Sequence, residues 1–369
     1  MKIIIAGDYC PHDRILDRIE KDDFSSVFGE VKDVISSADY SVLNFECPIV
    51  VGEGKPIDKI GPNLRCSEKG MSAIKWAGFK CVSLANNHFY DYGEKGVVDT
   101  LEVCDKMGVD RVGGGRNIKE SSVILYKMID NKSVAFINCC EHEFSIANDI
   151  KGGSNPINPI RQYYAIQEAK EKADYVVVIV HGGHEHWQLP SPRMQETYRF
   201  FINAGADVIV NHHQHCFSGY EVYKGRPIFY GLGNFCFDRP DKRNTLWNQG
   251  YMVKLNMDAV ISWEIIPYNQ CDAEPRIVML NNDAFDTPIK ALNDIILNEE
   301  KLAQETNQYY KACARHYSNI FEPFRNRLYL ACKQRGWLPS LISKKNKLTA
   351  KNYIYCEAHR DKLIWWLNQ

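Results

Sequence analysis

Short apolar runs rich in β-branched residues recur along the first 210 residues of the chain. They lie at residues 2–7, 41–45, 80–85, 133–139, 175–180 and 207–210. Runs of this length, bounded by turn residues, are typical of buried strands. The segments between them include amphipathic stretches with helix start and stop signals, such as Ser67 and Gly78 around one and Ser191-Pro192 and Gly205 around another. This alternation predicts an α/β domain in which helices cover a mixed sheet.

Polar side chains end five of these runs. They are Asp8; Asn44 and Glu46; Asn86, Asn87, His88 and Asp91; His181, His184, Glu185 and His186; and His213 and His215. Taken singly, each has an ordinary interpretation as a turn residue or helix cap, and the histidines at 212, 213 and 215 fit a solvated loop. Because ligands of open α/β sheets bind beyond the carboxyl ends of the strands, five such ends together favour one shared site.

These side chains are of the types that bind divalent metal ions. Carboxylates, a carboxamide oxygen and imidazoles suit Zn, Mn or Fe and require no thiolate. His213 and His215 are two residues apart, so on an extended segment both would point to one side. Glu46 is a candidate to bridge two ions about 3.5–4 Å apart. His88, next to Asn87, is a candidate to protonate a leaving group.

The pattern changes in the second half of the chain. Residues 219–268 read as hairpins, with a Lys-Gly turn at 224–225 and a second turn near Asp258. Beyond about residue 280 the sequence has the pattern of amphipathic helices. We therefore expect a domain of residues 1–280 followed by a helical segment of residues 281–369. The sequence leaves open whether that segment covers the site, docks a partner or completes the fold.

Composition limits the possible partners and the compartment. The net charge of -1, with 25% charged residues, gives no indication of a nucleic-acid or membrane-surface partner. No apolar run approaches the roughly 18 residues of a membrane span, and the N-terminal run is too short for a signal peptide. The 13 cysteines are scattered without C-x-x-C spacing, which favours reduced, buried thiols. We expect a cytoplasmic protein without membrane insertion.

Seven segments together resemble one family. They are "IAGDYCPHDR", "LNFECPIV", "AGFKCVSLANNHFYDYG", "VGGGRN", "HGGHE", "NHHQHC" and "GLGNFCFD", in this order between residue 2 and about residue 240. They are similar to motifs of the bacterial capsule-synthesis CapA family of the poly-γ-glutamate type. That resemblance implies the calcineurin-like metallophosphoesterase fold, a four-layer αββα sandwich, here followed by the C-terminal helical segment.

The resemblance also implies roles for particular residues. Asp8 and His215 would bind a first divalent ion, Glu46 would bridge, and Asn87, His181 and His213 would complete a second site. His88 and Asp91 would be catalytic, with His88 as the acid beside the leaving group. Arg65, Arg116 and Glu185 would contact the substrate. The first strand departs from phosphoesterases of this fold, since Cys10 stands where they carry a histidine and His12 follows two residues later.

Two functions fit these expectations. The first is a metal-dependent hydrolase that cleaves a phosphoester or a γ-glutamyl or other amide bond in capsule, poly-γ-glutamate or surface-polymer biosynthesis. The alternative is a non-catalytic accessory or polymer-binding protein on the same fold. The full set of ligands favours catalysis. The expected partners are an anionic small molecule or polymer and other capsule-synthesis proteins, and no nucleic acid.

Overall fold

The computed structural model describes residues 1–320, 322, 326–355, 359 and 367. The chain divides into a first compact unit, Met1–Leu302, and a second, Ala303–Gln369. Helix α8 (Asp286–Ile296) falls in the segment that the sequence assigns to the C-terminal part, and it contacts β11 (Tyr220–Tyr223) within the first unit. A functional division near residue 280 stays a prediction.

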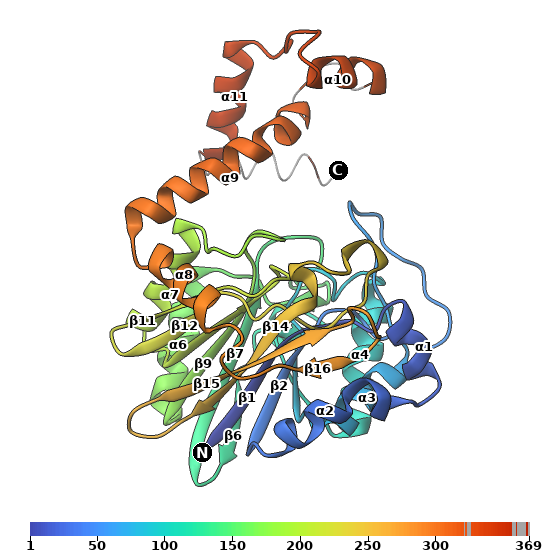
Figure 1. Cartoon of the computed structure of the whole chain (residues 1–369), viewed down its shortest axis with the longest axis vertical. Helices are drawn as coiled ribbons and strands as arrows, with labels where there is room; N and C mark the ends of the chain where they lie inside the picture. The colour runs from blue at the N-terminus through green and yellow to red at the C-terminus, as the bar shows by residue number, and fades with distance from the viewer. Residues whose placement is uncertain (321, 323–325, 356–358, 360–366, 368–369) are drawn as a thin grey trace. The chain divides into compact units, whose positions relative to one another are not determined.

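One sheet of the first unit contains the N-terminal strand. Its strands run in the order β16-β15-β14-β1-β2-β3-β4, and β13 also pairs with β1. The bounds are β1 (Lys2–Tyr9), β2 (Tyr40–Phe45), β3 (Cys81–Ser83), β4 (Asp110–Val112), β13 (Asn234–Cys236), β14 (Gln249–Asn256), β15 (Ser262–Gln270) and β16 (Ile277–Met279). Strands β1 to β4 are parallel, whereas β14, β15 and β16 join through antiparallel pairings, so the sheet is mixed. Helices α1 (Arg14–Glu20), α2 (Phe24–Ser36), α3 (Glu68–Ala77) and α4 (Gly93–Met107) belong to this half (Figure 1).

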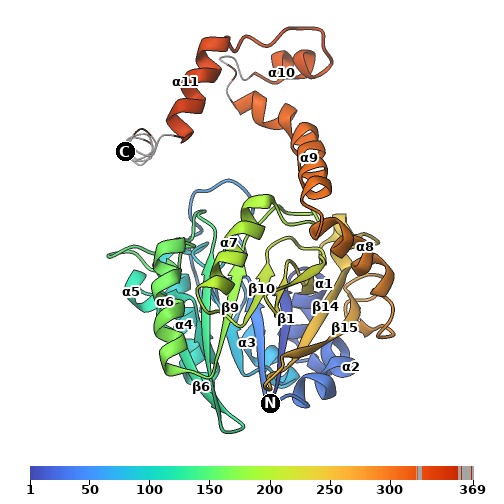
Figure 2. The ribbon, with the colours of Figure 1, turned by 90° about the vertical axis from the view of Figure 1, so that its left-hand side faces the viewer.

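The second sheet runs in the order β11-β12-β10-β9-β7-β6 and is also mixed. Its remaining strands are β6 (Leu125–Ile129), β7 (Lys132–Cys140), β9 (Tyr175–His181), β10 (Val208–His212) and β12 (Arg226–Phe229). Helices α6 (Pro159–Lys172) and α7 (Pro192–Asn203) lie over it, as Figure 2 shows. A two-stranded pair, β5 (Gly114–Gly115) and β8 (Gly153–Ser154), and the short helix α5 (Ile118–Ser121) complete the unit.

Three buried apolar clusters define the layers. Along β1, Ile4 packs toward the outer helices, while Ile3 and Ile5 face the second sheet, because successive side chains of a strand point to opposite sides. The second sheet divides in the same way, with Val177 in the cluster between the sheets and Val178 in the cluster under α6 and α7. The order helix, sheet, sheet, helix confirms the predicted αββα sandwich.

The predicted start and stop signals are confirmed at several elements. The Ser67 hydroxyl accepts a hydrogen bond from the Lys69 N–H (3.2 Å), and Gly78 ends α3 with φ 103°. Ser191 caps α7 in the same way, ahead of Pro192. The hairpin of β11 and β12 turns at Lys224 (φ 50°) and Gly225 (φ 76°), as the Lys-Gly pair predicts for a tight turn with two left-handed residues.

The second unit is helical, as predicted. Helix α9 (Glu299–Ile320) leads into it, and α10 (Arg327–Gln334) and α11 (Lys344–Tyr355) follow. Glu322 organises the turn between α10 and α11, since its carboxylate accepts from Tyr329 Oη (3.0 Å), Ser340 Oγ (2.6 Å) and Leu341 N (3.1 Å). Among the described residues, no helix is long and apolar enough to cross a membrane.

Candidate metal centre

Five strand ends from the two sheets meet at one edge of the sandwich. Asp8 lies on β1, Glu46 follows β2, Asn87 follows β3, His181 ends β9 and His213 follows β10. A close approach of two backbones sets the position of Asp8. The Asp8 N–H donates to the Gly233 carbonyl (3.1 Å), and a Cβ on the neighbouring Gly7 would lie 1.9 Å from that same oxygen. Glycine at position 7 therefore lets β1 lie against the loop before β13.

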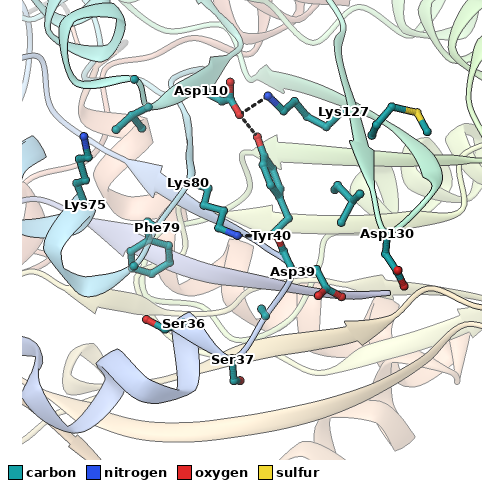
Figure 3. Close-up of a pocket in the computed structure, with 16 residues that line it drawn as sticks. Ser36, Ser37, Asp39, Tyr40, Lys75, Phe79, Lys80, Asp110, Lys127 and Asp130 are labelled. Carbon is teal, nitrogen blue, oxygen red and sulfur yellow. Dashed lines mark hydrogen bonds and ion pairs between the residues drawn. The ribbon is translucent and has the colours of Figure 1, made fainter.

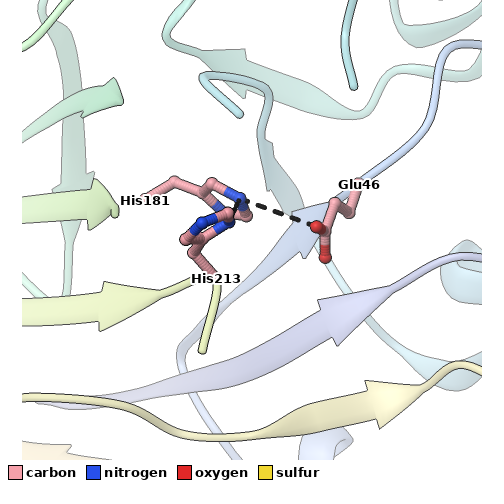
Figure 4. A group of neighbouring side chains, drawn as sticks. All are labelled: Glu46, His181 and His213. Atoms are coloured by element: carbon pink, nitrogen blue, oxygen red, sulfur yellow. Dashed lines mark hydrogen bonds and ion pairs between the residues drawn. The ribbon is translucent and has the colours of Figure 1, made fainter. Parts of the chain in front are cut away.

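Two potential ligand groups share Glu46. The first comprises Glu46, His181 and His213 (Figure 4), and the second comprises Asp8, Glu46 and His215; in each, the ligand atoms lie within 4.8 Å of one another. Glu46 Oε1 is 3.6 Å from His181 Nε2 and 3.5 Å from His215 Nε2. Asn87 Oδ1 lies 3.0 Å from His181 Nε2, so the carboxamide reaches the first group as well. All the predicted metal ligands thus lie in one cluster with Glu46 between its two halves.

The burial of Glu46 and its lack of hydrogen-bond donors among the described residues suit a carboxylate that binds a cation. Its side chain is fully buried, and neither carboxylate oxygen accepts a hydrogen bond from the part of the chain that the structure describes. Burial, together with the charge of Asp8, raises the pKa of Glu46 well above its usual value. A buried carboxylate without donors is costly when ionised, and a divalent ion would offset that cost.

The histidines are in the form that binds metals. Burial lowers the pKa of His181 and of His215 well below the ordinary value, and neighbouring imidazoles lower both further. Both rings are therefore neutral at physiological pH, with a nitrogen lone pair available. Neutral imidazoles beside the Glu46 and Asp8 carboxylates are a donor set that divalent transition ions bind, so the residues fit such ions.

Neighbouring amides orient these ligands. The Asn44 amide donates to Asp8 Oδ1 (2.8 Å) and lies 3.2 Å from His181 Nδ1. Asn234 Oδ1 lies 2.8 Å from His215 Nδ1, which leaves Nε2 of that ring toward Glu46. Burial raises the pKa of Asp8 to about 7, although the His213 N–H and the Asn44 amide lower it. Partners of this kind fix ring orientation and ligand basicity at metal sites.

The loop after β10 differs from the extended conformation expected for it. Strand β10 ends at His212, and His213 and His215 have φ of 93° and 55°, in the region that non-glycine residues rarely adopt. The expectation of an extended segment is wrong here, because alternate left-handed residues, and not strand alternation, bring both rings to the cluster. Such conformations gather at functional sites, where the surrounding structure holds them.

His212 is a buried neighbour of this cluster. It belongs to neither ligand group, and its ring nitrogens have no hydrogen-bond partner among the described residues. Nδ1 lies 3.5 Å from Asp8 Oδ1. Burial lowers the pKa of His212 to about 3, so the ring is neutral.

A second constellation lies beside the ligands. His88 Nδ1 is 2.6 Å from Asp91 Oδ2, and Asp91 Oδ1 is bound by the Lys59 ammonium. Lys59 also lies 3.2 Å from His88 Nδ1, and the Leu64 N–H donates to Asp91 (2.7 Å). The Lys59 side chain is only 3% exposed. The sequence analysis missed this lysine, which comes from the irregular loop before α3.

A pocket of about 230 Å³ opens next to the cluster. Its lining residues include His12, His88, Glu185, His215, Phe237, Arg239 and Trp247. The ring of His215 packs 4.6 Å from that of Trp247, which forms an aromatic wall. Arg239 is the cationic side chain among the lining residues, and it also pairs with Asp241 (3.2 Å).

Of the three residues predicted to contact substrate, one lies at this pocket. Glu185 lines it. Arg65 is instead exposed and lies over the Tyr92 ring (5.4 Å), and Arg116 pairs with Glu120 (3.0 Å). The sequence analysis missed Arg239, which directly follows the quoted "GLGNFCFD" segment and is the better placed arginine.

A larger pocket of about 910 Å³ lies at the opposite, amino ends of the strands (Figure 3). Its charged groups are already engaged: Tyr40 Oη donates to Asp110 (2.6 Å), Lys127 pairs with the same carboxylate (2.8 Å), and Lys80 donates to the Asp39 carbonyl (2.8 Å). It contains no residue of the metal cluster. Size alone therefore does not identify the site.

Comparisons with known proteins agree with this picture. The family described as "Bacterial capsule synthesis protein PGA_cap" matches residues 2–239. The capsule biosynthesis protein CapA of Bacillus anthracis is 32% identical over 289 residues, covering 75% of this chain and 69% of that protein. The PGA biosynthesis protein CapA of Bacillus subtilis is 34% identical over 272 residues, covering 72% and 71%.

A solved 5'-nucleotidase from Candida albicans aligns with 84% of this chain and 57% of that chain, at 11% identity and a TM-score of 0.42. The family match, in contrast, includes all the candidate ligands, from Asp8 on β1 to His215 after β10. With a match over residues 2–239 and relatives above 30% identity, the chain belongs to the PGA_cap family of bacterial capsule synthesis proteins.

Proposed function

We propose that this protein is a metal-dependent hydrolase that cleaves a phosphoester or a γ-glutamyl or other amide bond in the synthesis of capsule, poly-γ-glutamate or a related surface polymer. The observation that carries the proposal is Glu46, a fully buried carboxylate shared by two ligand groups and without a hydrogen-bond donor among the described residues. A protein that needed only the fold would gain stability from an apolar residue there.

Two divalent ions, of Mn, Zn or Fe, would be held by this cluster. Asp8 and His215 would bind one, Asn87, His181 and His213 the other, and Glu46 both. Such ions act as Lewis acids on a phosphoryl or carbonyl group and lower the pKa of water.

His88 and Asp91 supply proton transfer. Asp91 accepts from Nδ1 of His88, so Nε2 is the nitrogen that gives or takes a proton at the pocket. Lys59 and the Leu64 N–H hold the Asp91 carboxylate in place. The leaving group of the substrate would receive its proton from this ring.

The pocket favours an anionic substrate with an apolar portion. Arg239 would bind a phosphate or carboxylate group, since a guanidinium fits such groups with paired hydrogen bonds. Trp247 and Phe237 would pack against the rest of the molecule. Glu185, at the pocket rim, would contact a cationic or hydroxyl group.

An accessory role is the second candidate. The descriptions of the family and of both Bacillus relatives name a biosynthetic process and no reaction. In that role the cluster would hold ions for structure, and the protein would bind polymer or other capsule-synthesis proteins.

The test is the metal content of the protein together with its turnover. The wild type, purified without chelator, is expected to hold about two divalent ions per chain. The double variant His213→Ala/His215→Ala is expected to lose them, and His142→Ala, an exposed histidine outside both groups, to keep them. A generic phosphodiester and a γ-glutamyl amide then distinguish the reaction classes.

Each result has a clear meaning. Ions without turnover of either substrate favour the accessory role. A wild type that stays metal-free after incubation with Mn and Zn would overturn the hydrolase proposal.

A further inference from the structure

The net charge of -1 is the sum of two opposite charges, one on each unit of the chain. Residues 1–302 contain 33 Lys and Arg against 42 Asp and Glu, whereas residues 303–369 contain 12 against 4. The units therefore carry net charges of -9 and +8. Eight of the basic residues fall between Arg325 and Lys351, a stretch without an acidic residue. The whole-chain charge, used above to discount a membrane-surface partner, averages over this asymmetry.

The same stretch exposes large apolar side chains. Leu328 is 76% exposed, Trp337 70% and Leu348 59%, and Ile354, three residues beyond Lys351, is 50% exposed. Leu338 and Leu341, in the loop between α10 and α11, are also exposed. Scattered exposed leucines are ordinary, but this many in so short a segment are typical of an interaction surface.

Basic and apolar groups are interleaved in this stretch. The Arg335 guanidinium lies over the Trp337 ring (5.4 Å), and Lys344, Lys345 and Lys347 begin α11 just after Leu341. We define the C-terminal basic surface as Leu328, Arg335, Trp337, Leu338, Leu341, Lys344, Lys345, Lys347, Leu348, Lys351 and Ile354. All are exposed in the second unit.

We propose that the C-terminal basic surface binds the surface of an anionic lipid bilayer. Lysines and arginines are attracted to acidic headgroups, and each one near the surface adds to the affinity. Tryptophan and leucine side chains bury in the boundary between headgroups and acyl chains, where tryptophan is enriched. This mode is peripheral and needs no spanning helix.

Binding of a soluble polyanion would explain the basic residues of this surface but not its exposed apolar side chains. A nucleic acid or an acidic polymer would neutralise the lysines, but it would leave the exposed leucines Leu341 and Leu348 in water. A bilayer surface accommodates both kinds of side chain. The inference does not depend on the proposed hydrolase activity, since it concerns the second unit alone.

The test is flotation of the full chain with vesicles. One set of vesicles is pure phosphatidylcholine, and the other contains about one third phosphatidylglycerol, which provides the negative surface potential. Three variants are compared with the wild type: Lys344→Glu/Lys345→Glu/Lys347→Glu, Trp337→Ser/Leu341→Ser, and a matched charge reversal on the first unit, Lys21→Glu/Lys119→Glu/Lys224→Glu. Circular dichroism checks that each variant is folded.

The wild type is expected to float with the anionic vesicles only, and to be released by salt. The charge reversal at residues 344–347 is expected to weaken binding at least about tenfold. The variant Trp337→Ser/Leu341→Ser is expected to bind the vesicles more weakly, with binding still released by salt. The charge-reversed variant of the first unit is expected to bind like the wild type.

Three results would overturn the proposal. The first is that the wild type does not float with anionic vesicles. The second is that the charge reversal on the first unit weakens binding as much as the reversal at residues 344–347. The third is that polyglutamate or DNA displaces the vesicles and still binds the serine variant, which would identify a soluble polyanion as the partner. Should a variant not fold, the comparison of the wild type on neutral and anionic vesicles still decides.

Discussion

His88 Nδ1 lies 2.6 Å from Oδ2 of Asp91, and both side chains are buried next to the candidate metal ligands. The bond fixes the ring so that its other nitrogen is the one at the pocket. His88 also follows Asn87 directly, so the backbone places the proposed proton-transfer group beside a proposed ligand of one ion.

Replacing His88 should separate proton transfer from metal binding. We expect His88→Asn to lower turnover by about 10²–10⁴-fold, the usual contribution of a positioned general acid. Asp91→Asn should lower it less, because the ring remains. Metal content, measured by mass spectrometry, should not change in either variant; loss of the ions from His88→Asn would show that the ring serves the metal centre instead.

Glu46→Gln should change the dependence of stability on pH in the metal-free protein. The raised pKa means that folded Glu46 keeps its proton at a pH where the unfolded chain, with an ordinary pKa of 4.5, has lost it. The wild type in chelator therefore loses up to about 1.4 kcal/mol per pH unit from this group as pH rises above 4.5. Glutamine does not titrate, so the stability of the variant relative to the wild type should increase between about pH 5 and 7.

Urea unfolding in chelator at several pH values measures this difference, and effects of the histidines cancel because both proteins contain them. Added Mn should stabilise the wild type and have little effect on Glu46→Gln, since ligands that bind only the folded state raise its stability. A difference that does not vary with pH would contradict the assignment of Glu46 as a buried, unpaired carboxylate.

The sequence predicted the features that repeat locally. Strands with β-branched runs and the helices bounded by Ser67 and Gly78 or by Ser191 and Pro192 are present, because turn and capping chemistry acts over a few residues. Most candidate ligands were found for the same reason: they follow directly on buried strands. The sequence analysis predicts no helix at α2, although Val27, Phe28, Val31 and Ile35 have the spacing of a buried helix face.

Features that depend on tertiary folding were not predictable in this way. The burial of Lys59 arises when its loop folds over His88 and Asp91, and nothing in the neighbouring residues signals it. The positive φ of His213 and His215 depends on contacts with distant strands, so local alternation suggested an extended segment. The sequence analysis predicts Arg65 and Arg116 and not Arg239 at the pocket, because the pocket is formed by loops far apart in the sequence.

Lys59→Met should destabilise the protein strongly. It removes the ammonium from a fully buried carboxylate, and loss of one partner of a buried pair typically costs about 3–5 kcal/mol. Lys59→Arg keeps the charge and should recover part of that loss, while the exposed control Lys95→Met, whose pair with Asp99 is at the surface, should lose less than about 1 kcal/mol. Urea unfolding compares the three variants; equal effects of Lys59→Met and Lys95→Met would contradict a role for Lys59 in holding Asp91.

Arg239→Ala should weaken substrate binding without loss of metal. A guanidinium that binds an anionic group contributes about 1.5–3 kcal/mol, which corresponds to a rise in KM of roughly 10–100-fold. Arg116→Ala, which removes only an exposed pair with Glu120, should leave KM unchanged. Steady-state kinetics on whichever substrate turns over provides the measurement. A larger rise in KM for Arg116→Ala than for Arg239→Ala would instead identify Arg116 as the substrate contact.

His212→Leu should make the metal-free protein more resistant to acid. Burial lowers the pKa of His212 to about 3, so below about pH 6.5 the unfolded chain takes up a proton at this residue that the folded chain does not. That difference removes about 2 kcal/mol of stability between pH 7 and pH 5, and it is absent when residue 212 cannot titrate. Because the ring nitrogens have no hydrogen-bond partner among the described residues, leucine should cost little at pH 7. Urea unfolding of both proteins at pH 7 and pH 5 measures the difference, and a variant that loses as much stability as the wild type on acidification would show that His212 is protonated in the folded protein.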